Sequence, residues 1–134
     1  MAGVRARLDH VTVSASDFAL SLAFYDAALG ALGLHRVVEL GDEEEDGAEL
    51  EVAAWGTGDV AVLWLVAGAA PTRGVHLALR ADSPADVEAF HRSALAAGGR
   101  SHDAPRRWPI FRAGEFNAIV LDPDGNLVEA VASE

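Results

Sequence analysis

Two stretches of the chain repeat apolar residues at every third or fourth position, which predicts two amphipathic helices. The first begins at Ser16 or Asp17, either of which can cap it, and stops at Gly33. The second opens at Ser83, followed by a proline at the first helical position, and ends at Gly98 and Gly99. The remaining segments are short, β-branched or aromatic and bounded by turn residues, and they predict strands over 8–14, 34–40, 49–55, 60–67, 74–80, 115–121 and 126–131.

The predicted order is strand, helix, three strands, and it then repeats with two or three strands at its end. An offset of 66 residues (76 − 10) aligns His10 with His76, Phe24 with Phe90, Ala28 with Ala94, Leu29 with Leu95 and Gly33 with Gly99. We therefore expect one domain over residues 1–134, built from two βαβββ modules at about 7–67 and about 73–131. The predicted fold class is α+β, with the modules paired into a half-open, cup-like mixed β-barrel and the helices outside.

Strand alternation predicts which side chains face the inside of this cup. Val11 and Val13 suit the helix-covered side, which leaves His10 on the concave side. The same alternation puts His76 and Glu129 on the concave side of their strands. Two imidazoles and a carboxylate suit a facial site for Fe, Mn, Zn or Ni, and this ligand set does not choose among those metals. Strand histidines also serve as hydrogen-bonded core or surface groups, so a purely structural interpretation stays open.

Composition narrows the chemistry further. The 134 residues carry 21 acids and ten bases, a net charge of −11 that disfavours nucleic acid and membrane surfaces as partners. All ten bases are arginine and cysteine is absent, which excludes lysine Schiff bases, thiolate nucleophiles and sulfur ligands for a metal. No apolar run is long enough for a membrane span, and the first residues lack the apolar core of a signal peptide, so we expect a cytoplasmic protein.

Four segments carry a family resemblance: LDHVTV (8–13), FYDAALG (24–30), GVHLA (74–78) and VLDPDGNLVE (120–129). Over nearly its whole length the chain resembles the vicinal oxygen chelate superfamily, the group of glyoxalase I, fosfomycin- and bleomycin-resistance proteins and extradiol dioxygenases. The resemblance implies a divalent metal ion on the concave face, with His10, His76 and Glu129 as its ligands. It also implies a homodimer, because sites of this family are commonly completed by subunit pairing.

The chain departs from the family's glyoxalase-like members in its fourth strand. Those members add a glutamate there, and Trp64 stands at that place in this chain. Tryptophan neither binds metal nor moves a proton, which argues against glyoxalase I activity itself. The two-His-one-Glu set matches the dioxygenase and fosfomycin-type patterns instead. On strand 115–121, Glu115 is the titratable residue expected to face inward and is the candidate for moving a proton, with Asn117 beside it in the pocket.

The segment 105–114 mixes three arginines with Trp108 and Phe111. It is either a pocket lid for an anionic or aromatic ligand, with Arg112 among the lining residues, or an exposed loop.

Two functions follow from these observations. The first is a metal-dependent lyase, dioxygenase or transferase acting on a small oxygen-bearing substrate. The alternative is a metal-free, drug-sequestering protein that stacks a planar small molecule on Trp64 and Trp108.

Overall fold

The computed structural model describes residues 3, 5–40, 51–108 and 113–134. The first module contains β1 (Val11–Ala15), α1 (Phe18–Gly30), β2 (His35–Leu40), β3 (Val52–Thr57) and β4 (Val60–Ala67). The second module contains β5 (His76–Arg80), α2 (Pro84–Ala96), β6 (Arg100–Arg107), β7 (Glu115–Leu121) and β8 (Leu127–Ser133). The α+β class and the two βαβββ modules are therefore confirmed, and β6 supplies the strand that the repeat required.

The predicted helix starts are also correct. The side chain of Asp17 accepts a hydrogen bond from the amide of Leu20 and begins α1. Ser83 caps α2 in the same way, with Pro84 at the first helical position, where its missing N–H leaves no helical hydrogen bond unmade. None of the helices in the described residues is long and apolar enough to cross a membrane.

Each module forms its own four-stranded sheet, with the order β1-β4-β3-β2 in the first and β5-β8-β7-β6 in the second. β1 pairs in parallel with β4, and β5 with β8, whereas the other neighbours are antiparallel. β1 and β5 are thus edge strands, and within the described residues neither sheet is hydrogen-bonded to the other. In the part of the chain that the structure describes, the two sheets therefore do not close into a barrel.

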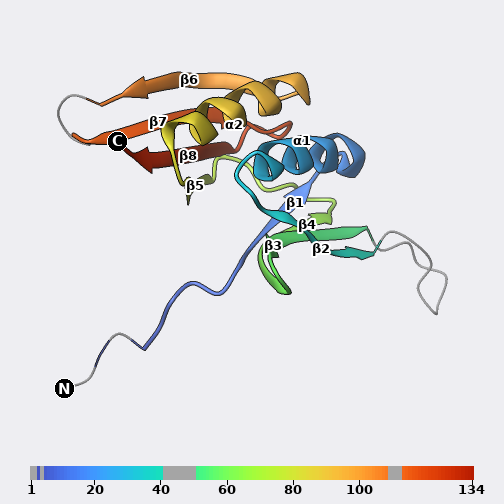
Figure 1. Ribbon diagram of the computed structural model, residues 1–134. Coiled ribbons are helices and arrows are strands. Elements are labelled where there is room, and N and C mark those ends of the chain that lie inside the picture. The colour runs from blue at the N-terminus through green and yellow to red at the C-terminus, as the bar shows by residue number, and fades with distance from the viewer. Residues whose placement is uncertain (1–2, 4, 41–50, 109–112) are drawn as a thin grey trace, which may run out of the picture.

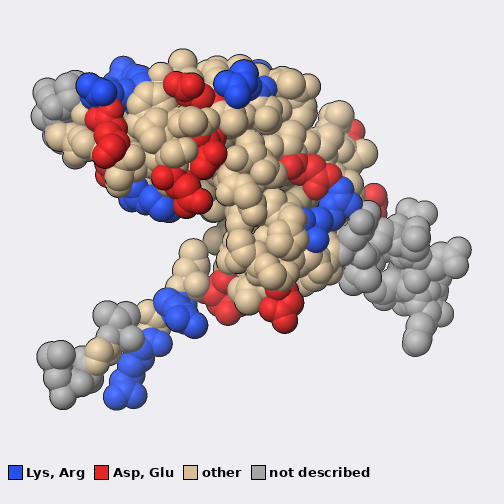
Figure 2. All heavy atoms as spheres, in the orientation of Figure 1, with Lys and Arg blue, Asp and Glu red and all other residues tan. Residues whose placement is uncertain are grey.

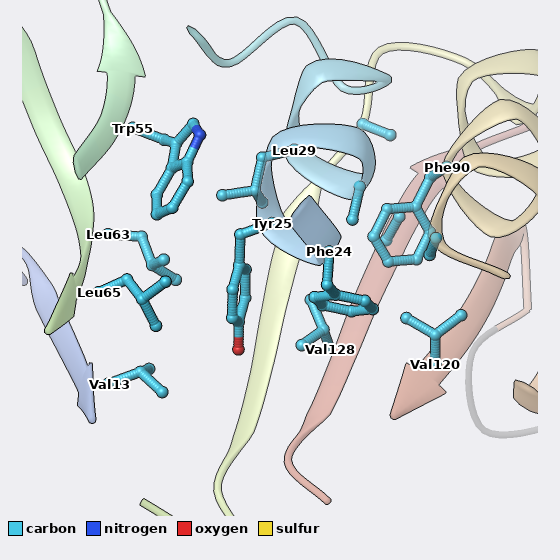
Figure 3. Close-up of a cluster of buried hydrophobic side chains, with 14 of the residues drawn as sticks. Val13, Phe24, Tyr25, Leu29, Trp55, Leu63, Leu65, Phe90, Val120 and Val128 are labelled. Carbon is cyan, nitrogen blue, oxygen red and sulfur yellow. The ribbon is translucent and has the colours of Figure 1, made fainter. Parts of the chain in front are cut away.

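The hydrophobic core lies between the two sheets (Figure 3). Val13 of β1 and Leu65 of β4 point inward from the first sheet, and Val128 of β8 points inward from the second. Between them, Phe24 of α1 and Phe90 of α2 are fully buried, and the two helices pack against each other (Figures 1 and 3).

Each helix therefore covers one face of its own sheet, as expected. The two helix-covered faces look toward each other, so the other face of each sheet, here called the open face, points away from the molecule's centre. One chain presents two half-cups that open in opposite directions.

The turn between β7 and β8 joins the modules. Tyr25 of α1 donates a hydrogen bond from Oη to Oδ2 of Asp122 at 2.6 Å, and Ser16 bonds to Asp124. Burial, followed by the nearby Asp122 carboxylate, raises the pKa of Tyr25 far above its usual range. Asn126 extends the connection by donating to the carbonyl of Thr72 in the segment that links the modules. The DPDGN turn thus serves as the polar part of the interface between modules.

Candidate functional site

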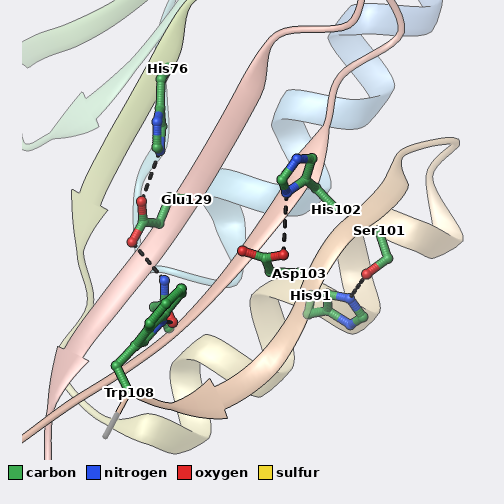
Figure 4. A network of polar contacts seen from close by, with 8 residues as sticks. His76, His91, Ser101, His102, Asp103, Trp108 and Glu129 are labelled. Atoms are coloured by element: carbon green, nitrogen blue, oxygen red, sulfur yellow. Dashed lines mark hydrogen bonds and ion pairs between the residues drawn. The ribbon is translucent and has the colours of Figure 1, made fainter. Parts of the chain in front are cut away.

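The open face of the second sheet brings His76 and Glu129 together. β5 and β8 are parallel neighbours in which Ala78 lies opposite Glu129, so His76 and Glu129 share a face by alternation. His76 Nε2 lies 2.8 Å from Glu129 Oε1 (Figure 4). Half of the His76 side chain is exposed, whereas the Glu129 side chain is only 2% exposed. The pair is a nitrogen and an oxygen ligand presented side by side from two adjacent strands.

Asn117 of β7 holds the carboxylate from its other side. Its Nδ2 donates to Glu129 Oε2 at 2.9 Å, and its Oδ1 accepts a hydrogen bond from Nε1 of Trp108. Asn117 is fully buried. A carboxylate this deeply buried destabilises a fold unless its oxygens are hydrogen-bonded, and here both oxygens have partners. The orientation of Glu129 is therefore determined by protein contacts.

His10 lies on the other sheet. It directly precedes β1, its Nδ1 lies 2.7 Å from Oδ2 of Asp9, and its ring contacts that of Trp64 edge-on with 6.3 Å between centroids. A carboxylate on Nδ1 leaves Nε2 as the other ring nitrogen for a ligand role. Because the open faces point in opposite directions, His10 does not meet His76 and Glu129 within one chain. Among the described residues no cluster of three or more His, Cys, Asp or Glu side chains could hold a metal ion.

The strand register shows that Trp64 and Glu129 lie at equivalent positions in the two sheets. Thr12 of β1 lies opposite Trp64, and its repeat equivalent Ala78 of β5 lies opposite Glu129. Trp64 therefore occupies in the first module the position that Glu129 occupies in the second. Sequence reasoning expected an acid at this point of the fourth strand in glyoxalase-like proteins, and the register agrees with that alignment.

The other predicted site residues are spread over the second module. Glu115 lies near the end of the same open face and forms an ion pair with Arg80 at 3.2 Å. Trp108 is half-buried at the end of β6, beside Asn117. Phe111 and Arg112 lie outside the described residues. Those lining assignments stay predictions.

Sequence reasoning did not single out Arg106. It lies in β6 opposite Asn117, on the open face, and its guanidinium carbon stacks 4.1 Å from the centre of the Trp108 ring. Strand alternation over 100–107 could have placed Arg106 on the open face, but the arginines and Pro105 obscure that alternation.

Two further histidine contacts in the second module lie apart from this site. His91 Nε2 lies 2.7 Å from the hydroxyl of Ser101, and His102 Nδ1 lies 3.3 Å from Asp103 (Figure 4). Burial lowers the pKa of His91.

An apolar cleft of about 240 Å³ separates the two edge strands, β1 and β5. Leu8, Val11, Val62 and Leu63 line it from the first module, and His76, Leu77, Ala78 and Leu79 from the second. The segment before β1 stands away from the body of the chain, and Leu8 in it is 79% exposed (Figures 1 and 2). His76 thus borders a region with apolar surface and an unpaired strand edge.

Comparisons with known proteins bear on this site. A family model described as the glyoxalase/bleomycin resistance protein/dioxygenase superfamily matches residues 7–130. No curated protein matches the chain in sequence. A crystal structure of a glyoxalase/bleomycin resistance protein from Albidiferax ferrireducens T118 is similar, with a TM-score of 0.72 and 25% identity over 92% of this chain and 97% of that one.

Two more distant structures share the fold. A glyoxalase/bleomycin resistance protein/dioxygenase family enzyme from Burkholderia phytofirmans PsJN has a TM-score of 0.66 and 18% identity, covering 96% of this chain and all 100% of that one. Glyoxalase I from Zea mays has a TM-score of 0.64 and 19% identity, and the match covers 93% of this chain but 44% of that one.

Proposed function

The chain belongs to the glyoxalase/bleomycin resistance protein/dioxygenase superfamily, and from that premise we propose that it is a divalent-metal-dependent enzyme for a small oxygen-bearing substrate. The contact of His76 with the buried Glu129 is the single observation that carries the proposal. An imidazole nitrogen and an oriented carboxylate suit Fe, Mn, Zn or Ni, and a third ligand from a separate element would complete a facial set.

We propose that a second copy of the chain supplies the third ligand, His10 of the partner subunit. β1 and β5 are both edge strands, with the apolar cleft between them and the exposed Leu8 nearby. Pairing β1 of one copy with β5 of the other would cover these edges and bring the two half-cups together. Two-fold symmetry then gives two equivalent sites in a homodimer.

The residues of the site provide nitrogen and oxygen atoms that divalent metals bind, and a neighbouring side chain holds one of these ligands in place. Glu129 is fixed through Asn117, and such outer partners raise metal affinity by holding a ligand in place. When bound, the metal would polarise the oxygens of the substrate as a Lewis acid. Glu115, on the same open face, is the carboxylate proposed to move a proton, and Trp64 beside His10 would shape the pocket and exclude water.

Glyoxalase I activity is not the reaction proposed. Trp64 occupies the position equivalent to Glu129, so the fourth strand of the first module offers no carboxylate there. The two-His-one-Glu set favours a lyase, dioxygenase or transferase reaction instead.

Metal content tests the proposal. Elemental analysis of protein purified without chelators, followed by reconstitution with Fe, Mn, Ni and Zn, should give one metal ion per chain. His76→Ala should abolish retention while the fold persists, because half of that side chain is exposed. His91→Ala is the matched control, since His91 lies apart from the site. Unchanged metal content in His76→Ala would overturn the metal site.

A mixing experiment tests whether the site is shared. His10→Ala and His76→Ala homodimers should each fail to retain metal. After unfolding together and refolding, mixed dimers should regain one metal ion per dimer, because one of their two sites has all three ligands. No recovery in the mixed dimers would contradict a site built across subunits.

The metal-free binding protein remains the second candidate, and partly exposed tryptophans on both open faces favour it. Trp64 lies beside His10, and Trp108 lies beside Asn117. This function predicts that a planar aromatic ligand quenches tryptophan fluorescence equally with and without a chelator. Quenching that requires metal would favour the enzyme.

A further inference from the structure

Arginines on the open face of the second sheet differ in how their charge is matched. Arg80 forms an ion pair with Glu115 at 3.2 Å. Arg106 has no carboxylate within ion-pair distance among the described residues, and its guanidinium stacks on the Trp108 ring. Its sequence neighbour Arg107 lies opposite Phe116 in the register, on the helix-covered side, and pairs with Glu134. Arg106 is therefore a positive charge on the site face that the described protein leaves unneutralised.

The position of Arg106 is nevertheless defined. A guanidinium stacked on an indole is held by cation–π attraction while the N–H groups at its edge stay available as donors. Trp108 is itself fixed by its hydrogen bond to Asn117, which also holds Glu129. A continuous series of contacts thus connects the guanidinium to the carboxylate that faces His76.

The distance between these groups sets the size of a ligand. β6 and β8 are separated by β7, so their backbones lie roughly 10 Å apart. A ligand that spans a comparable distance can therefore place two oxygens beside His76 and Glu129 and a third group beside Arg106. The net charge of the chain is −11, so most of the protein repels an anion. A guanidinium without a carboxylate partner attracts an anion to its own position.

We infer that Arg106 binds an anionic group of the substrate, a carboxylate- or phosphate-type oxyanion, at the end remote from the oxygens that the metal holds. The inference rests on the proposed metal site and adds the substrate class: a small, anionic, oxygen-chelating molecule. Trp108 positions the guanidinium, and Arg106 determines specificity without taking part in proton transfer.

Matched hydroxamates test the inference, because their two adjacent oxygens chelate a metal ion. The probes are hexanohydroxamate and adipic acid monohydroxamate, which share a chain length and differ in a terminal carboxylate. Titration calorimetry with the full-length zinc-loaded protein should give roughly tenfold or tighter binding of the carboxylate probe, as a charge-assisted hydrogen bond warrants. A third arm, the same chain ending in a phosphonate, distinguishes the two oxyanions.

Two variants distinguish a direct contact of Arg106 with the probe from a general effect of positive charge on probe binding. Arg106→Gln should make the two probes bind equally, whereas the matched control Arg107→Gln should keep the preference. Equal binding to the wild type, or a preference that survives in Arg106→Gln, would overturn the inference while leaving the metal site standing. If neither hydroxamate binds the zinc-treated protein, the proposed metal site fails and this inference fails with it.

Discussion

The two modules share a topology and differ in the chemistry of their open faces. In the second module, Glu129 and Asn117 form a buried polar pair beside His76. Strand register puts Trp64 and Val52 at the equivalent positions of the first module, because Trp64 lies opposite Thr12 and Val52 lies opposite Val66. Each module therefore carries a histidine on its open face, and the second module adds a buried carboxylate. This difference suits one metal site to which the two modules contribute different ligands.

We expect the largest change in metal affinity from removing the charge of Glu129, the buried carboxylate that distinguishes the second module from the first. Glu129→Gln keeps the shape of the side chain and removes its charge, so metal affinity should fall by more than roughly 100-fold, beyond the loss typical of an outer partner. Competition with a chelator followed by elemental analysis measures the change. Glu115→Gln, on the same face but outside the ligand pair, is the control and should retain the metal.

Asn117→Val gives the second module the residue found at the equivalent position of the first. The substitution leaves Glu129 Oε2 without its amide donor, so the free energy of unfolding should fall by about 1.5–3 kcal/mol. Metal affinity should fall by roughly 10- to 100-fold as the carboxylate loses its fixed orientation. Urea unfolding and metal titration measure the two effects separately, and unchanged values in both would mean that Asn117 does not support the site.

Trp64→Glu makes the converse change in the first module. It adds a carboxylate at the position equivalent to Glu129, next to His10. If the open faces meet in a dimer, the new carboxylate should raise metal affinity by roughly tenfold. Trp64→Gln is the uncharged control. Equal affinity in the two variants would contradict a site that includes this position.

The smallest effect concerns the contact between the modules. Tyr25→Phe removes the hydrogen bond to Asp122 and should lower the free energy of unfolding by about 1 kcal/mol at neutral pH. The raised pKa of Tyr25 also makes stability depend on alkaline pH: above about pH 10 the unfolded chain releases this proton and the folded chain keeps it, so stability falls as pH rises.

The chain suits this measurement because it has one tyrosine, no lysine and no cysteine. Urea unfolding of the wild type between pH 9 and 11 should therefore lose stability at up to about 1.4 kcal/mol per pH unit. Tyr25→Phe should remove most of that slope. An unchanged slope in the variant would mean that another group titrates.

The sequence was a good guide to local structure. Both helices, the cap at Ser83, a first cap at Ser16 or Asp17, and the two-module repeat follow from patterns within short windows, where propensity and alternation decide the outcome. The structure settled the first cap as Asp17. Alternation also assigned His76 and Glu129 to one face, because the pleat of a strand fixes side-chain direction whatever the strand packs against. β6 was harder to recognise, since Pro105 and a run of arginines hide its alternation. The sequence pattern therefore predicts a lid or loop for the arginines of 105–114, and it does not assign Arg106 to a strand face.

The sequence by itself determined both helices, the strands other than β6, the two-module repeat and the faces on which His10, His76 and Glu129 lie. Only the tertiary structure decided that the helix-covered faces meet each other, which separates His10 from the other two residues within one chain. That arrangement depends on contacts between residues far apart along the chain, such as Tyr25 with Asp122 and α1 with α2, and local periodicity carries no information about them. Register likewise decided that Trp64 corresponds to Glu129 and that Arg106 lies opposite Asn117, because pairing between strands is a property of the sheet.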